Sequence, residues 1–182
     1  MPRNFILTLT GPDRIGIVHE VTGLLLDRGG NVETSRMARL GGEFAILMLV
    51  SIPEGRFAGL DEGLEGLTAR GYKVTTTPAE RTYAQSHPGW RLYRIEVRGA
   101  DHEGIVHEVA HFLSRLGINI ESVDSETAPA PTSGVPLFAM TARVEVPPDL
   151  TAGAWEAGLE EIAGRMNVEI RATAIDDSSS GL

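Results

Sequence analysis

The sequence predicts an α+β fold made of two copies of one βαββαβ unit in tandem. Residues 11–21 recur with few changes as residues 99–109, so each residue lies 88 positions after its counterpart, as Gly99 does after Gly11. Within each copy, stretches that alternate apolar and polar side chains flank stretches with helical spacing. Three more residues match at the same offset: Gly29, Asn31 and Glu33 with Gly117, Asn119 and Glu121.

The first copy begins with a strand and a helix. Residues 5–10 alternate apolar and polar side chains, as a half-buried strand does. Asp13 follows in a turn, where its side chain has the chemistry of an N-cap for the next helix. That helix is expected to end at Gly29 and Gly30. Its apolar stripe consists of Ile17, Val21, Leu24 and Leu25.

A hairpin, a second helix and a last strand complete the first copy. Residues 31–40 and the apolar run 44–52 are expected to pair as strands across a tight Gly41-Gly42 turn. A helix over 60–70 and a strand over 72–77 follow. The second copy repeats this order: strand 92–98, a turn at Asp101, a helix ending at Gly117, strands 118–126 and 137–146, helix 152–165 and strand 168–174.

This element order is the ferredoxin-like arrangement, an antiparallel sheet with both helices on one face. We expect two such domains, residues 1–80 and 91–175. Residues 81–90 have the composition of a linker, and residues 176–182 that of a frayed tail. Because side-by-side pairing protects sheet edges, we expect the two copies to pair with each other, with a homodimer as a further option.

Composition and charge narrow the function classes. The formal net charge is −9 and the 16 Lys and Arg residues are scattered, so the basic face on which nucleic-acid binding depends is not expected. No apolar run approaches the roughly 18–20 residues that cross a bilayer, and the N-terminus lacks the apolar region of a signal peptide. Without any cysteine, nothing calls for an oxidising compartment, so we expect a cytoplasmic protein without membrane contact.

Short motifs carry a resemblance to a known family. Asp-x-x-Gly-Ile-Val precedes the first helix of each copy, and Gly-x-Asn with an apolar residue follows it. This pattern resembles the ACT domain, a small-molecule-sensing module. Residues 128–138 (Ala-Pro-Ala-Pro-Thr-Ser-Gly-Val-Pro-Leu-Phe) are similar to the long proline-containing connection of glycine cleavage system transcriptional repressors, which are tandem ACT chains without a catalytic domain. The sequence leaves open whether residues 129–134 form a lid or a docking loop.

The ACT resemblance implies an amino acid bound between two units, by the first turn of one unit and the Asn after the first helix of the other. A helix N-terminus suits the ligand carboxylate, glycine allows close backbone approach, and Asn or Asp can pair with the ammonium. Each Asp can equally be only an N-cap, and each Asn only a turn residue. The implied ligand-binding residues are Asp13, Gly16, Ile17, Asn31, Asp101, Gly104, Ile105 and Asn119.

A second motif points to a different chemistry. His107, Glu108 and His111 match His-Glu-x-x-His, in which two His on a helix chelate zinc and the Glu acts as base. The first copy has Gly23 in place of the second His. A catalytic zinc also needs a third protein ligand, for which Glu121 and Glu126 are the downstream candidates with no reason to converge. We therefore expect neither a metal site nor catalytic residues here.

The sequence thus predicts a regulatory protein that is not an enzyme and needs no cofactor. The leading hypothesis is an amino-acid sensor for glycine or a similar ligand, like those repressors. It would act through a protein partner such as a transcription regulator rather than by binding DNA directly. Three alternatives remain: an ACT regulatory subunit of an amino-acid or folate enzyme, a zinc hydrolase using His107, Glu108 and His111, and a ligand-free dimerisation module.

Overall fold

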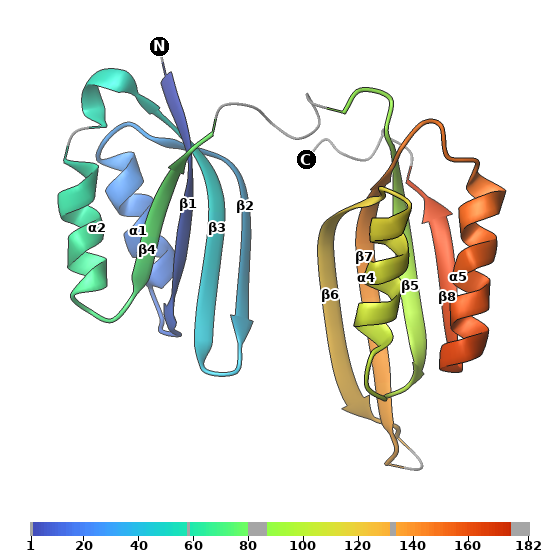
Figure 1. The fold of residues 1–182 in the computed structure, drawn as a ribbon. Coiled ribbons are helices and arrows are strands. Elements are labelled where there is room, and N and C mark those ends of the chain that lie inside the picture. Colours follow the sequence, from blue (N-terminus) through green and yellow to red (C-terminus); the bar gives the residue numbers. More distant parts are fainter. Residues whose placement is uncertain (1, 58, 80–86, 132–133, 176–182) are drawn as a thin grey trace. The chain divides into compact units, whose positions relative to one another are not determined.

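The computed structural model describes residues 2–57, 59–79, 87–131 and 134–175 (Figure 1). The chain divides into two compact units, Met1–Ser86 and His87–Leu182, called unit 1 and unit 2 below. Residues 81–86 of the predicted linker, residues 132–133 of the predicted long connection and the predicted tail 176–182 lie outside the described residues. No helix among the described residues is long and apolar enough to span a membrane.

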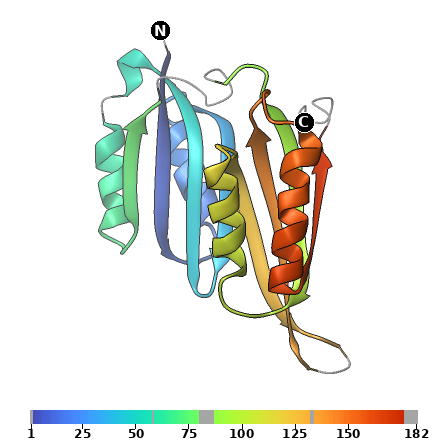
Figure 2. The same ribbon diagram turned by 45° about the vertical axis from the view of Figure 1, so that its right-hand side comes forward.

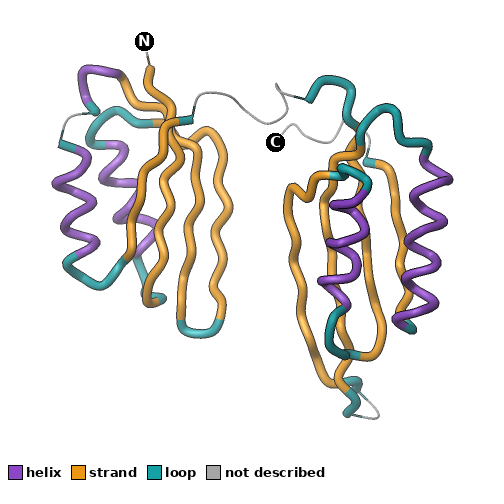
Figure 3. The backbone as a smooth tube through the Cα atoms, in the orientation of Figure 1, coloured by secondary structure: helices purple, strands orange, loops and turns teal. Residues whose placement is uncertain are grey.

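Unit 1 is an antiparallel four-stranded sheet with strand order β2-β3-β1-β4 and helices on one face (Figure 3). Helix α1 connects the first two strands and α2 the last two (Figure 1). This is the predicted βαββαβ order. The elements are β1 (Pro2–Pro12), α1 (Ile17–Leu26), β2 (Asn31–Leu40), β3 (Glu43–Pro53), a short 3-10 helix η1 (Glu54–Arg56), α2 (Leu60–Thr68) and β4 (Lys73–Pro78).

Unit 2 repeats this topology with strand order β6-β7-β5-β8. Figure 2 shows α4 and α5 over one face of its sheet. The ferredoxin-like fold predicted for each copy is therefore confirmed. The elements are β5 (Arg91–Ala100), α4 (Ile105–Arg115), β6 (Asn119–Pro129), β7 (Pro136–Val146), α5 (Ala152–Met166) and β8 (Val168–Ala174).

Each unit buries its own core between the sheet and the helices. In β1, every second side chain is buried, from Phe5 through Leu7 to Leu9, because successive side chains of a strand point to opposite faces. Helix α1 covers them with Ile17, Val21 and Leu25. The predicted apolar stripe is thus the helix face that packs on the sheet. The buried residues of unit 2 form a second, separate cluster.

The two helices of unit 2 approach closely at a glycine. A Cβ added at Gly158 in α5 would lie 2.4 Å from Cζ of Phe112 in α4. Unit 1 has a milder version, in which a Cβ at Gly63 would lie 3.1 Å from Cδ2 of Leu24. Leu24 and Phe112 are counterparts in the two copies, so both units fit a large side chain of the first helix against a glycine of the second.

Replacing Gly158 with valine is expected to destabilise unit 2 by about 1–3 kcal/mol, the usual cost of overpacking a well-filled interior. Gly164 is the matched control, because it lies on the same helix and nothing lies within 4 Å of an added Cβ. Gly164→Ala is expected to be neutral or stabilising by up to about 1 kcal/mol, since alanine is the better helix former. Urea unfolding measures both, and equal stability of the two variants would contradict the close approach.

Candidate functional site

The first helix of each unit begins at a glycine in left-handed backbone. Gly16 has φ 90° and Gly104 has φ 93°, and each is the N-cap residue of its helix. Nothing lies within 4 Å of a Cβ added at Gly16, so the backbone conformation rather than crowding favours glycine there. No described side chain caps either helix, so the first turns of α1 and α4 keep a capacity to bind an anion, although the Ile17 N–H of α1 also donates to the Arg14 oxygen at 3.4 Å.

The prediction that Asp13 and Asp101 cap these helices is wrong. Each lies three residues before its glycine N-cap, because the pairing of β1 with β3, and of β5 with β7, continues that far along the chain. The backbone N–H of Asp13 donates to the Gly42 oxygen at 2.9 Å, and that of Asp101 to the Pro136 oxygen at 2.9 Å. The Asp13 carboxylate instead lies 3.7 Å from Nη1 of Arg39.

The second half of the predicted site follows the same helix in each unit. Gly117 (φ 69°) directly follows the C-cap of α4 in left-handed backbone, as predicted. Helix α1 ends earlier than the predicted stop at Gly29 and Gly30, at Leu26, and Gly29 (φ 65°) closes the turn that follows it. Asn31 and Asn119 are then the first residues of β2 and β6. Each helix is therefore flanked by a turn residue of the predicted site at its start and by an Asn at its end.

Both Asn side chains lie beside a carboxylate. Asn31 Nδ2 donates to Glu33 Oε1 at 3.0 Å, and Ser51 Oγ donates to the same oxygen at 2.7 Å. These hydrogen bonds, first from Ser51 and then from Asn31, lower the pKa of Glu33. In unit 2, Asn119 Nδ2 donates to Glu145 Oε2 at 2.9 Å. An amide held by an ionised carboxylate suits the ammonium group of a ligand.

Sequence reasoning did not assign Glu33 and Glu145 to the site. Glu33 and its counterpart Glu121 each sit at an irregularity of the strand register, between residues 32 and 34 and between 120 and 122. Glu121 accepts a hydrogen bond from Arg143 Nε at 3.0 Å. Glu33 is one of the residues that recur in the second copy, so the repeat could have drawn attention to it. Glu145 could be found only from the pairing of β6 with β7, which places it opposite Asn119.

Within one unit the turn and the Asn do not meet. Gly16 precedes α1 and Asn31 follows it, and a helix of 10 residues is about 15 Å long at about 1.5 Å per residue. The structure thus brings Asp13, Gly16 and Ile17 together at one end of α1, and the same holds for Asp101, Gly104 and Ile105 in unit 2. The side chains of Ile17 and Ile105 are each 2% exposed and belong to the cores.

The turns before α1 and α4 carry different basic residues, Arg14 in unit 1 and His102 in unit 2. In unit 1, Arg14 pairs with Glu20 and lies 5.6 Å from the centre of the Tyr72 ring. In unit 2, the counterpart is His102, whose Nδ1 lies 3.0 Å from the Glu103 oxygen and Nε2 2.7 Å from the Met166 oxygen. Both partners are carbonyl acceptors, and only a protonated imidazole can donate to both. These contacts raise the pKa of His102.

The raised pKa of His102 predicts a pH-dependent stability of unit 2. A group whose pKa is higher in the folded chain contributes its full stabilisation below the unfolded value, about 6.5 for His, and loses it as pH rises through the folded value. We therefore expect stability to fall as pH rises from about 6.5. His102→Asn removes that component, and His111→Asn on the exposed face of α4 is the control. Identical pH profiles of unfolding for wild type and His102→Asn would contradict the assignment.

The zinc-protease motif has a structural explanation. Glu108 pairs with Arg165 at the end of α5, and its counterpart Glu20 pairs with Arg70 after α2. The ion pair thus exists also in the copy without a second His, so it belongs to the duplicated helix packing. The rings of His107 and His111 lie parallel on the surface with centres 6.0 Å apart. In the described part of the chain, no three His, Cys, Asp or Glu residues gather to hold a metal.

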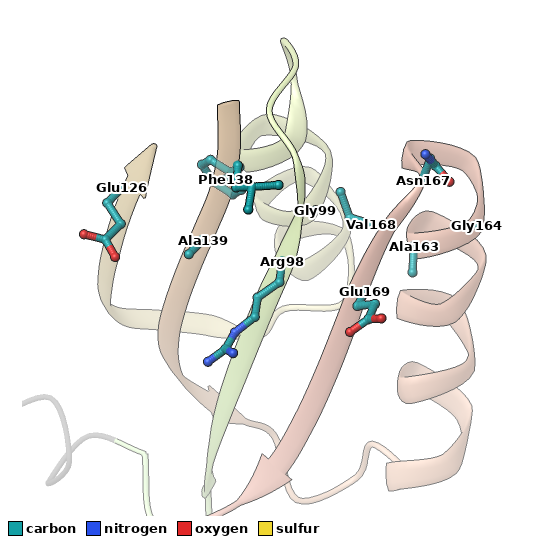
Figure 4. Close-up of a pocket in the computed structure, with 11 residues that line it drawn as sticks. Arg98, Gly99, Glu126, Phe138, Ala139, Ala163, Gly164, Asn167, Val168 and Glu169 are labelled. Atoms are coloured by element: carbon teal, nitrogen blue, oxygen red, sulfur yellow. The ribbon is translucent and has the colours of Figure 1, made fainter. Parts of the chain in front are cut away.

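An open hollow of about 860 Å³ lies in unit 2, at the end of the sheet where β5 ends and β8 begins (Figure 4). Its charged lining comes from Arg98, Glu126 and Glu169, and α5 contributes its end at Asn167. None of the predicted ligand-binding residues lines it. The hollow therefore does not include the predicted half-sites at the start and the end of α4.

Comparison with known families and curated proteins identifies relatives of the chain. Residues 3–72 match the family model of the ACT domain. The glycine cleavage system transcriptional repressors of Escherichia coli (strain K12) and Shigella flexneri are each 29% identical over 127 residues, which is 69% of this chain and 65% of the relative. The matched segment therefore spans less than two thirds of the length of these relatives.

Two solved structures resemble the whole chain. An unknown protein from Galdieria sulphuraria is 34% identical with a TM-score of 0.86, and the match covers 97% of this chain and 100% of that one. A protein assigned as a glycine cleavage system transcriptional repressor is 20% identical with a TM-score of 0.67, covering 97% and 99% of the two chains. At that identity the second match shows a shared fold.

Proposed function

We propose that this chain, whose residues 3–72 match the ACT domain and which resembles the glycine cleavage system transcriptional repressors, is a tandem ACT-domain protein that senses an amino acid and regulates through a protein partner. One observation carries the proposal. Both units combine an uncapped helix start at a left-handed glycine with an Asn–carboxylate pair just beyond the end of the same helix.

These two half-sites suit the two poles of an amino acid. The N–H groups at the start of α1 or α4, together with the partial positive charge of the helix end, bind the carboxylate. The Asn side-chain oxygen and the neighbouring carboxylate, Glu33 or Glu145, bind the ammonium. A small ligand such as glycine needs nothing more than these two poles.

A complete site requires both units. Because about 15 Å of helix separates the two half-sites within a unit, one ligand cannot reach both. In our proposal each ligand therefore lies between the turn of one unit and the Asn of another unit. Binding then favours one pairing geometry over another and changes the surface that the partner meets.

In this proposal the chain regulates by contacting a partner protein and does not contact DNA itself. The net charge of −9 opposes contact with phosphates, so transcriptional control by this chain needs a partner that contacts DNA. The role is regulatory rather than catalytic, because binding at the two poles changes pairing and breaks no bond in the ligand.

A thermal-shift screen of the purified chain against the proteinogenic amino acids tests the proposal. A ligand at a hundred times its dissociation constant adds about 2.7 kcal/mol, or several degrees at roughly 2–4 °C per kcal/mol. We expect such a shift with glycine or a close relative, and its loss in the double variant Asn31→Ala/Asn119→Ala. A shift that survives in the double variant would overturn the site, and no shift with any amino acid would overturn the sensor.

A further inference from the structure

Helix α4 of unit 2 carries two exposed histidines, which the proposed function does not use. His107 and His111 are four positions apart, so their side chains leave the same side of the helix one turn from each other. Their rings lie parallel, with an angle of 9° between the planes and centres 6.0 Å apart. Among the described residues, neither ring has a partner in a hydrogen bond or an ion pair. The ring nitrogens are therefore available to a ligand from solvent.

Two imidazoles one helical turn apart can chelate one metal ion. A metal–nitrogen bond of about 2.1 Å puts each ring centre about 3.2 Å from the metal, so two rings in neighbouring coordination positions have centres about 4.5–5.2 Å apart. The two rings of α4 need to approach each other by only about 1 Å to reach that arrangement. Exposed side chains change rotamer within nanoseconds, so small rotations about their bonds close the gap.

We propose that His107 and His111 bind a divalent transition-metal ion as a two-ligand site, with water in the remaining coordination positions. This site differs from a catalytic zinc, which needs a third protein ligand. In the described part of the chain, no third His, Cys, Asp or Glu gathers with the pair, so the bound ion exchanges with solvent. The sequence indicated no metal site by the criterion of three ligands, and the two-ligand site revises that expectation.

The residue between the two histidines sets a limit on the chemistry. Glu108 pairs with Arg165 of α5, and its counterpart Glu20 pairs with Arg70. In the zinc-protease motif this carboxylate is the general base, whereas here the helix packing holds it in an ion pair. The site therefore binds a metal ion without hydrolytic chemistry.

Imidazole ligands select the class of metal. Affinity for nitrogen sites rises through Ni²⁺ to Cu²⁺ and is lower again for Zn²⁺, whereas Mg²⁺ and Ca²⁺ prefer oxygen ligands. We therefore expect Ni²⁺, Cu²⁺ and Zn²⁺ to bind, and Mg²⁺ not to bind. The proposal is independent of amino-acid sensing, since neither histidine is among the predicted ligand-binding residues.

Unit 1 provides an internal comparison. His19 is the counterpart of His107, but Gly23 stands at the position of His111. The folding of the βαββαβ unit thus does not require the second histidine. Nothing lies within 4 Å of a Cβ added at Gly23, so a larger side chain fits there. The two-histidine site can therefore be copied into α1 by one substitution.

Calorimetric titration of the untagged full chain with NiCl₂ tests the proposal, with MgCl₂ as the negative control. We expect one Ni²⁺ per chain. His107→Asn and His111→Asn should each weaken binding at least tenfold, since losing even a group that orients a ligand costs roughly 10–100-fold. His19→Asn is the matched control and should bind like wild type. A wild type that binds no Ni²⁺, or binding that is unchanged in His111→Asn, would overturn the proposal.

Gly23→His provides a second readout, which depends on a gain of binding. The variant should bind two Ni²⁺ per chain, and its combination with His19→Asn should return the number to one. Circular dichroism verifies that both variants fold. A folded Gly23→His chain that still binds a single ion would show that two imidazoles one turn apart are not sufficient, and would refute the proposal.

Discussion

A chain that carries Gly16→Val together with Asn31→Ala is expected to bind no amino acid, although both changes lie in unit 1. If unlike units pair as proposed, each site would combine the turn of one unit with the Asn of the other. Gly16→Val therefore disables one site and Asn31→Ala the second. A chain with Gly16→Val and Asn119→Ala loses two halves of the same site, and we expect it to keep half of the wild-type binding stoichiometry.

The size of these effects follows from the contacts that are lost. A valine at φ 90° is strained, and its side chain stands where the ligand must approach the backbone. Removing an Asn that contacts the charged ligand costs about 1.5–3 kcal/mol, or more than tenfold in affinity. Equilibrium dialysis with labelled glycine measures the stoichiometry. Gly71→Val is the control, because Gly71 has φ 92° and open space like Gly16 but lies between α2 and β4.

The same pair of double variants distinguishes two ways of pairing. If units of the same kind paired between two copies of the chain, the turn of unit 1 would meet Asn31 of another chain. The Gly16→Val/Asn31→Ala chain would then keep the sites formed by unit 2. Half stoichiometry in that variant would therefore contradict pairing between unlike units.

A second large effect is expected in the cores. Leu7→Ala should cost unit 1 about 2–5 kcal/mol, the range measured when a buried leucine is truncated, because Leu7 is fully buried in β1. Ile95→Ala makes the matching change in unit 2, 88 residues later. Each unit has its own core cluster, so each substitution should destabilise only its own unit.

Tryptophan fluorescence separates the two units in this experiment. Trp90 and Trp155 both lie in unit 2, and Trp155 is buried in its core against Tyr93. The fluorescence midpoint in urea should therefore move in Ile95→Ala and stay constant in Leu7→Ala, while far-UV circular dichroism follows both units. A single transition that shifts equally in both variants would show that the units unfold as one body.

Much of the fold could be predicted because its signals are local. The alternation of Phe5, Leu7 and Leu9 marks a strand with one buried face, and the Gly41-Gly42 pair gives a two-residue hairpin turn, with Gly41 at φ 62°. Gly29 and Gly117 mark helix ends, since left-handed backbone there favours glycine. Strand limits were less accurate: β1 runs over Pro2–Pro12, whereas alternation indicated only 5–10.

The remaining features depend on cross-strand pairing. Asp13 has the side chain of an N-cap, but the pairing of β1 with β3 reaches Asp13 and the helix starts at Gly16. Asn119 finds its carboxylate at Glu145, 26 residues away, because the two residues face each other across β6 and β7. The contrast between Ile6 and Arg94 is visible in the sequence, but only the register places both on the sheet face opposite the core. Side-by-side pairing of the units stays a prediction.

Calorimetric titration of the full wild-type chain with glycine, at two temperatures so that no binding heat is missed, tests the central claim most directly. If glycine is silent, the same titration with each amino acid that shifts the melting temperature completes it. The account predicts saturable binding with at most two ligands per chain, lost in Asn31→Ala/Asn119→Ala. A folded chain that binds none of the proteinogenic amino acids would contradict the account. It would favour the alternative of a ligand-free dimerisation module.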